Sequence, residues 1–216
     1  MSIAQFRRAS ACAVAAWLGA FAGAPALAAD PHHQHHAPAP AAAGSPVGEA
    51  VQVRLNDTAL TDQFGRAVRL KTDVMADRIV VVDFVYTHCT TICPVASALL
   101  QQTQEQLGDS IERDVRLVTV TVDPVRDTPA RLKAYGARFG SGPGWVWLTG
   151  SKPQIDEVTQ AFGAWTPNFE NHPPVVLVGD PKHGKWVRFY GFPSPRQLAA
   201  AARELVAARA KTGVAG

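Results

Sequence analysis

Apolar residues along the chain form three compact runs, and each run is followed by a pattern typical of a helix. The runs at 79–86, 115–122 and 145–148 are rich in β-branched or aromatic residues and predict buried strands. Helices are expected to begin near Pro94, Pro129 and Pro153, since proline is well tolerated in the first turn. Strands that alternate with helices predict an α/β fold with a mostly parallel sheet covered on both faces.

Two further pairs of short apolar segments flank this central part. VQVRL (51–55) alternates like a strand, and a turn near 63–66 returns the chain into AVRL (67–70). VVLVG (175–179) and WVRFY (186–190) enclose a turn-rich DPKHGK and predict a second hairpin, before a last helix that opens at Ser194. A hairpin and a closing helix after the parallel units predict a thioredoxin-like fold, here with an N-terminal β-hairpin extension.

Spacing within the helices also predicts which residues face the core. The expected inward residues are Val95, Leu99, Thr103 and Leu107 in the first helix, Leu132, Tyr135 and Phe139 in the second, and Ile155, Val158 and Phe162 in the third. Asp127 is expected to cap or charge the start of the second helix. Three tryptophans on strands should pack, whereas Trp165 lies in a loop and is a candidate for an exposed partner surface.

The N-terminal segment predicts export. Arg7 and Arg8 precede an apolar stretch of about 14 residues, and small residues at Ala26 and Ala28 form an A-x-A site. This pattern predicts a signal peptide over 1–28 and a periplasmic protein; an uncleaved membrane anchor is the alternative. We expect a disordered lead rich in His, Pro and Ala over 29–48, an ordered thioredoxin-like domain over 49–210 and a flexible tail over 211–216.

Charge and cysteine content narrow the class of protein. Residues 1–28 hold two arginines and no acidic residue, so their removal lowers the formal charge from +3 to +1 (3 − 2 = 1). A nearly neutral chain without a basic, aromatic stripe argues against nucleic-acid binding. Of the three cysteines, Cys12 leaves with the signal peptide, and only Cys89 and Cys93 remain.

The segment YTHCTTICP (86–94) carries both of these cysteines to the expected start of a helix. Unpaired N–H groups and a partial positive charge there lower the pKa of a thiol, which favours nucleophilic attack or metal binding. Redox pairs of the thioredoxin type have two residues between the cysteines, whereas here there are three, a loop wide enough for two sulfurs around one ion. Soft thiolates select Cu(I), and an added imidazole also suits Cu(II). A permanent structural disulfide is the alternative.

A third ligand must come from elsewhere in the chain. His172 precedes a strand of the second hairpin, and in a thioredoxin-like fold that loop packs against the cysteines, which makes His172 the preferred ligand. His88 is the next candidate, although neighbouring side chains on an extended segment point apart. His183 lies in a turn and is expected to be solvated. The lead holds four imidazoles that predict weak metal binding, or else a solvated spacer: His32, His33, His35 and His36.

Three segments together resemble the Sco/SenC family of copper-handling thioredoxin-like proteins: YTHCTTICP, TVDPVRDTPARLKAYGARFG and NHPPVVLVGDPKHGKWVRFYG. The resemblance covers about residues 50–208. It implies Cys89, Cys93 and His172 as copper ligands, with Asp123 as a supporting residue beside the site. It also implies that copper passes to the CuA centre of cytochrome c oxidase subunit II, or that the cysteines of that centre are kept reduced.

Two departures from the family pattern and one rival function accompany this expectation. Many members have Pro-Asp where this chain has Thr90-Thr91, which removes a carboxylate near the metal, and Pro173-Pro174 replaces a more usual small polar residue after His172. The rival is a periplasmic thiol–disulfide oxidoreductase that uses Cys89 and Cys93 as a redox pair without copper. The expected partners are subunit II or another cuproprotein, and a periplasmic copper donor.

Overall fold

The computed structural model describes residues 48–213, with side chains up to 211. The expected signal peptide, nearly all of the lead and the last three residues of the tail lie outside this range. The strands are β1 (Glu49–Val51), β2 (Ala59–Asp62), β3 (Ala67–Arg69), β4 (Ile79–Val85), β5 (Val115–Thr121), β6 (Trp145–Thr149), β7 (Val175–Asp180) and β8 (Lys185–Tyr190). The helices are η1 (Leu70–Met75), α1 (Ile92–Leu107), η2 (Gly108–Ser110), α2 (Pro129–Ala137), α3 (Lys152–Phe162), η3 (Phe169–Asn171) and α4 (Pro195–Gly213).

The described strands form one eight-stranded sheet in the order β1-β8-β7-β4-β5-β6-β2-β3. Only β4–β5 and β5–β6 are parallel, and the other five neighbouring pairs are antiparallel. The prediction of a mostly parallel sheet is therefore wrong. Its two parallel pairs form the centre, whereas both hairpins add antiparallel strands on the outside. The sheet and its helices still form the expected thioredoxin-like α/β arrangement.

The N-terminal hairpin exists, but its first strand is not the expected one. Ala59–Asp62 pairs with Ala67–Arg69 across the turn that contains Gly65, whose φ of 79° is easy only for glycine. Of the segment 51–55, only Val51 belongs to a strand, and that strand pairs with β8 at the opposite edge of the sheet. Alternating residues identified extended chain at 51–55, but pairing decided which stretch became the strand.

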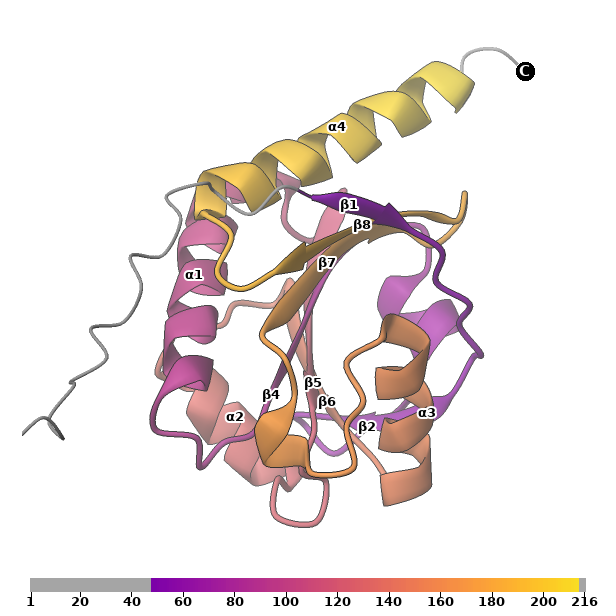
Figure 1. Cartoon of the computed structure of the whole chain (residues 1–216). Helices are drawn as coiled ribbons and strands as arrows, with labels where there is room; N and C mark the ends of the chain where they lie inside the picture. Colours follow the sequence, from indigo (N-terminus) through magenta and orange to yellow (C-terminus); the bar gives the residue numbers. More distant parts are fainter. Residues whose placement is uncertain (1–47, 214–216) are drawn as a thin grey trace, which may run out of the picture. The chain divides into compact units, whose positions relative to one another are not determined.

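Helices cover both faces of the sheet, as expected (Figure 1). One face packs against α1, α2 and α4 through residues such as Leu100, Leu132 and Leu198. The other packs against η1 and α3 through Leu70, Ile155 and others. Within the part of the chain that the structure describes, no helix is long and apolar enough to span a bilayer.

The buried side of α1 matches the expectation at Thr103 and Leu107 and differs from it nearer the start of the helix. Cys93, Ser97, Leu100, Thr103 and Leu107 face the sheet, whereas Val95 is largely exposed. The helix begins at Ile92, two residues before Pro94, and its inward face follows from Cys93. The first turn of α1, which carries Cys93, is therefore part of the hydrophobic core.

The direction of β7 depends on the segment between α3 and β7. From Gly163 the chain returns alongside α3, where the Trp165 indole N–H donates to Asp156, and then forms the single turn η3. It enters β7 beside the carboxyl end of β4, with Val176 opposite Asp83. This return path makes β7 antiparallel to β4 and brings His172 to the end of β4 that leads into the cysteine segment.

Candidate metal and redox site

The two cysteines lie at the junction between β4 and α1. Val85 ends β4, the turn Tyr86–Cys89 is closed by a 3.1 Å hydrogen bond from the Cys89 amide to the Tyr86 carbonyl, and Thr91 precedes α1. Both thiols are free and buried, with Cys89 6% and Cys93 1% exposed. The sequence-based placement of the pair at a strand–helix junction is confirmed.

Backbone amides of this junction face the Cys89 sulfur. Burial by itself would raise the pKa of Cys89, but hydrogen bonds from the amides of Cys93 and Thr91 outweigh it and lower the pKa to about 6. The Cys93 amide nitrogen lies 3.4 Å from the sulfur. The start of α1 thus favours the thiolate form of Cys89 at neutral pH.

Cys93 has the opposite character. Deeper burial raises the pKa of its thiol, and the neighbouring Cys89 sulfur raises it further. Asp83, in the middle of β4, lines the same small cavity as Cys93 and His172. Burial also raises the pKa of Asp83, to about 7, although Thr119 donates a hydrogen bond to one of its carboxylate oxygens. The pair therefore consists of one activated and one protonated thiol.

His172 is buried, with 4% of its surface exposed, and both ring nitrogens face backbone carbonyl oxygens. Nδ1 lies 2.8 Å from the Phe169 oxygen and Nε2 lies 3.2 Å from the Phe84 oxygen. The shorter Nδ1 contact orients the ring, as a hydrogen bond at the second nitrogen commonly does for a metal-binding histidine, whereas Nε2 would have to leave the Phe84 oxygen before it could bind a metal.

The ring of Tyr86 lies between the cysteine segment and the His172 loop. Its centroid is 4.7 Å from His88, 5.3 Å from Phe169 and 5.9 Å from His172. Burial raises the pKa of Tyr86 to about 12, so its hydroxyl stays protonated at neutral pH. This aromatic cluster holds the two segments together.

The three expected ligands share one region but not one coordination sphere. Cys93 and His172 line the same small cavity, yet among residues 48–213 no three His, Cys, Asp or Glu side chains are close enough to hold a metal ion as they stand. Binding by Cys89, Cys93 and His172 together would therefore require side chains to move. His32, His33, His35 and His36 lie outside the described residues.

Asp123 lies beside the site and is 4% exposed. Its carboxylate is 3.2 Å from the Arg126 guanidinium and 3.7 Å from Nδ1 of His88, the neighbour of Cys89. Arg126 in turn approaches Nε2 of His88 at 3.5 Å. The carboxylate of Asp123 thus offsets the charge of Arg126, and Asp123 contacts the cysteine segment through His88.

Asp127 was expected to cap or charge the start of α2, and of these two alternatives capping is wrong. Thr128 is the capping residue, and its hydroxyl accepts from the Arg131 amide. The fully buried Asp127 instead accepts from the Thr87 amide (3.0 Å), the Thr87 hydroxyl (2.6 Å) and the Thr121 hydroxyl (2.6 Å). It therefore fixes the segment two residues before Cys89.

Sequence reasoning missed Asp83 and the role of Asp127. The signal for Asp83 was present, since a carboxylate inside the apolar run IVVVDFVY (79–86) must be buried if the run is a central strand. Nothing in the sequence showed that the side chain of Asp127 turns away from α2 toward Thr87.

Comparison with known proteins decides the family. The model of the SCO1/SenC family matches residues 55–204. The chain belongs to the SCO1/SenC family. The SCO1 protein homolog of Bacillus subtilis is 31% identical over 120 residues, which are 54% of this chain and 60% of that protein. This chain therefore spans less than two thirds of that relative.

Solved structures of Sco proteins share the fold. BsSco, described as a member of the Sco family of cytochrome c oxidase assembly proteins with a disulfide switch, superposes with a TM-score of 0.62 at 24% identity, over 74% of this chain and 98% of that one. ScoI of Bradyrhizobium japonicum, solved with copper bound, has a TM-score of 0.57 at 26% identity, over 69% and 97%. The thioredoxin-like fold expected from the sequence is confirmed.

Proposed function

We propose that this protein is a copper metallochaperone that holds one copper ion through Cys89, Cys93 and His172 and passes it on for assembly of the CuA site of cytochrome c oxidase. The observation that carries the proposal is the donor set, two thiols and an imidazole at one end of the sheet. Cys89 is already stabilised as a thiolate, and Nε2 of His172 would reach a metal once the ring turns away from the Phe84 oxygen. Two thiolates and an imidazole suit both Cu(I) and Cu(II).

The proposed acceptor is cytochrome c oxidase subunit II or another cuproprotein, and a copper donor would act upstream. Related proteins support this direction, since one solved Sco protein carries copper and another belongs to a group described as oxidase assembly proteins. The signal-peptide pattern of residues 1–28 supports a periplasmic location. The four histidines of the lead are proposed to bind metal weakly.

The test is a competition between the reduced protein and a chelator for Cu(I), with His172→Ala as the variant. We expect wild type to bind one Cu(I) ion per protein. Loss of a residue that supports a metal ligand lowers metal affinity about 10–100-fold, so loss of the proposed ligand itself in His172→Ala should lower it at least as much. His183→Ala is the matched control, because His183 lies in the β7–β8 turn and contacts Asp180. Equal affinity in wild type and His172→Ala would remove His172 from the ligand set.

A second function is favoured by the contrast between the two thiols. A thiolate at Cys89 can attack a target disulfide and release one target sulfur as a thiolate. Cys93 then loses its proton, attacks Cys89 in the mixed disulfide and releases the other target sulfur, so the target is reduced and this protein becomes the disulfide. Such a thiol–disulfide oxidoreductase would tolerate His172→Ala. Reduction of one equivalent of a disulfide substrate by reduced, metal-free His172→Ala at the wild-type rate, together with no Cu(I) binding by wild type, would favour it.

A further inference from the structure

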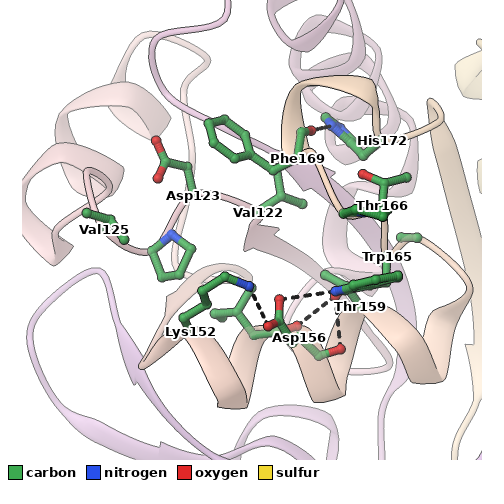
Figure 2. Close-up of a pocket in the computed structure, with 14 residues that line it drawn as sticks. Val122, Asp123, Val125, Lys152, Asp156, Thr159, Trp165, Thr166, Phe169 and His172 are labelled. Atoms are coloured by element: carbon green, nitrogen blue, oxygen red, sulfur yellow. Dashed lines mark hydrogen bonds and ion pairs between the residues drawn. The ribbon is translucent and has the colours of Figure 1, made fainter.

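A cavity opens directly beside His172, and it is separate from the small cavity that Cys93 lines. It has a volume of about 150 Å³ and lies between the loop after β5, the first turns of α3 and the segment 163–171 (Figure 2). We call it the Val125–Trp165 pocket, after two exposed residues that line it. Trp165 is 41% exposed and Val125 is 80% exposed.

The pocket is apolar inside and small. Its other apolar lining residues include Val122, Ile155, Ala164 and Phe169. Pockets for drug-sized ligands have roughly 300–1,000 Å³, whereas a cavity of about 150 Å³ holds a molecule the size of benzene. The pocket therefore fits one apolar side chain better than a cofactor.

Nearby hydroxyl and indole groups are already engaged within the protein. The Thr159 hydroxyl donates to the Ile155 carbonyl, the Thr166 hydroxyl donates to the Asn168 carbonyl, and the Trp165 N–H donates to Asp156. Figure 2 shows the Trp165 indole beside Asp156 and Thr159 along α3. An occupant thus meets apolar surface without leaving these groups unpaired.

The charges around the pocket are arranged with the cations outward. Lys152 is 65% exposed and pairs with Asp156, which is 32% exposed; Arg126 is 56% exposed and pairs with Asp123, which is 4% exposed. The carboxylates lie deeper than their partners, so two cations face an approaching molecule near this pocket. Glu170, on η3, is the exposed acidic residue next to the lining residue Phe169. Both cations are paired and Glu170 adds a third carboxylate, so the charges around the pocket offset one another and its apolar lining determines what it can bind.

We propose that the Val125–Trp165 pocket is the docking site for the protein that receives the copper ion, which inserts one apolar side chain into it. This inference rests on the proposed function. His172 lines the pocket, so a side chain seated there places its own chain next to the donor's imidazole. Ligand exchange between two proteins requires such an approach, and a buried apolar anchor is the usual source of docking energy.

The test is copper transfer from the loaded, full mature protein to the soluble, metal-free two-copper domain of cytochrome c oxidase subunit II. The transfer rate is measured against acceptor concentration for Val125→Glu and Lys152→Glu. Val125 is on the surface, and an acidic residue is favourable at the first position of α3, so both variants should fold. Matched controls are Phe64→Ala, at an exposed aromatic on the β2–β3 turn, and Lys185→Glu, at an exposed lysine of β8.

We expect the half-saturating acceptor concentration to rise about tenfold or more in Val125→Glu, the effect of losing one anchor, with a smaller rise in Lys152→Glu, which removes the cation paired with Asp156, the partner of Trp165. The copper affinity of both variants and the transfer by both controls should match wild type. Transfer by Val125→Glu at the wild-type rate and half-saturation would overturn the docking site and leave the chaperone function standing. Wild type that binds copper but transfers none would overturn the docking site and the proposed acceptor together.

Discussion

The backbone amide of Cys93 points at the sulfur of Cys89 across 3.4 Å. Because this amide belongs to the first turn of α1, the helix itself stabilises the thiolate. An ordinary cysteine has a pKa of about 8.5, whereas that of Cys89 is lowered to about 6. The two cysteines therefore differ in reactivity because of the backbone between them.

We predict that iodoacetamide modifies Cys89 before Cys93 in the reduced, metal-free protein. The rate should rise with pH to a plateau, with its midpoint near pH 6, and peptide mass spectrometry identifies the site. Cys93→Ser keeps the amide and should preserve the midpoint. Thr91→Asp adds a carboxylate beside the sulfur and should move the midpoint upward. A midpoint near 8.5 in wild type would contradict the predicted stabilisation.

Asp83 predicts a specific dependence of stability on pH. Burial raises its pKa in the folded protein to about 7 from an ordinary 3.8, so between these values the folded protein keeps a proton that the unfolded chain releases. The free energy of unfolding contributed by Asp83 must then fall as pH rises through this window. Asp83→Asn removes the titrating group. Urea unfolding should show its stability relative to wild type increasing from near pH 5 to near pH 8, and a constant difference would refute the assignment.

Asp127 predicts a large loss of stability on truncation. Asp127→Ala leaves the buried hydroxyl of Thr121 and the part-buried amide and hydroxyl of Thr87 without their acceptor. Each unsatisfied buried group costs about 1–3 kcal/mol, so we expect a loss of at least about 2 kcal/mol in the free energy of unfolding. Asp127→Asn retains one acceptor and should lose less. Chemical denaturation measures both, and equal stability of Asp127→Ala and wild type would show that water replaces the carboxylate.

Gly179 in β7 is a position where we expect any side chain to destabilise the fold. A methyl group there would lie 2.1 Å from the indole of Trp186, which is itself buried. Gly179→Ala should lower the free energy of unfolding by about 1–3 kcal/mol or more, as overpacking does. Gly184→Ala is the comparison, because it has open space but a φ of 64°, and should cost only about 1 kcal/mol. Thermal or urea unfolding of the two variants should rank them in this order.

Much of the fold followed from local patterns. The strands at 79–86, 115–122 and 145–148 and the helix starts near Pro129 and Pro153 were predictable because burial and proline act locally. The direction of β7 relative to β4 was not predictable, because it depends on how residues 163–174 return along α3. The pairing of β1 with β8 likewise joins segments more than 130 residues apart, and alternation within 51–55 contains no information about its partner.

The candidate site was predictable in its location but not in its electrostatics. Spacing and the expected helix start located Cys89 and Cys93, and the fold brought His172 near them. The roles of Asp83 and Asp127 depend on which way their side chains point from known elements, which a single sequence does not give. The separation of the three expected ligands in this conformation also could not be read from spacing.

The place of β7 in the sheet has a consequence for biosynthesis. Cys89 and Cys93 leave the ribosome some eighty residues before His172, and the imidazole reaches the thiols only after β7 has joined β4. A nascent or truncated chain that ends before β7 therefore holds two thiols without the histidine. If copper is held as proposed, such a chain would retain it less tightly than the finished protein.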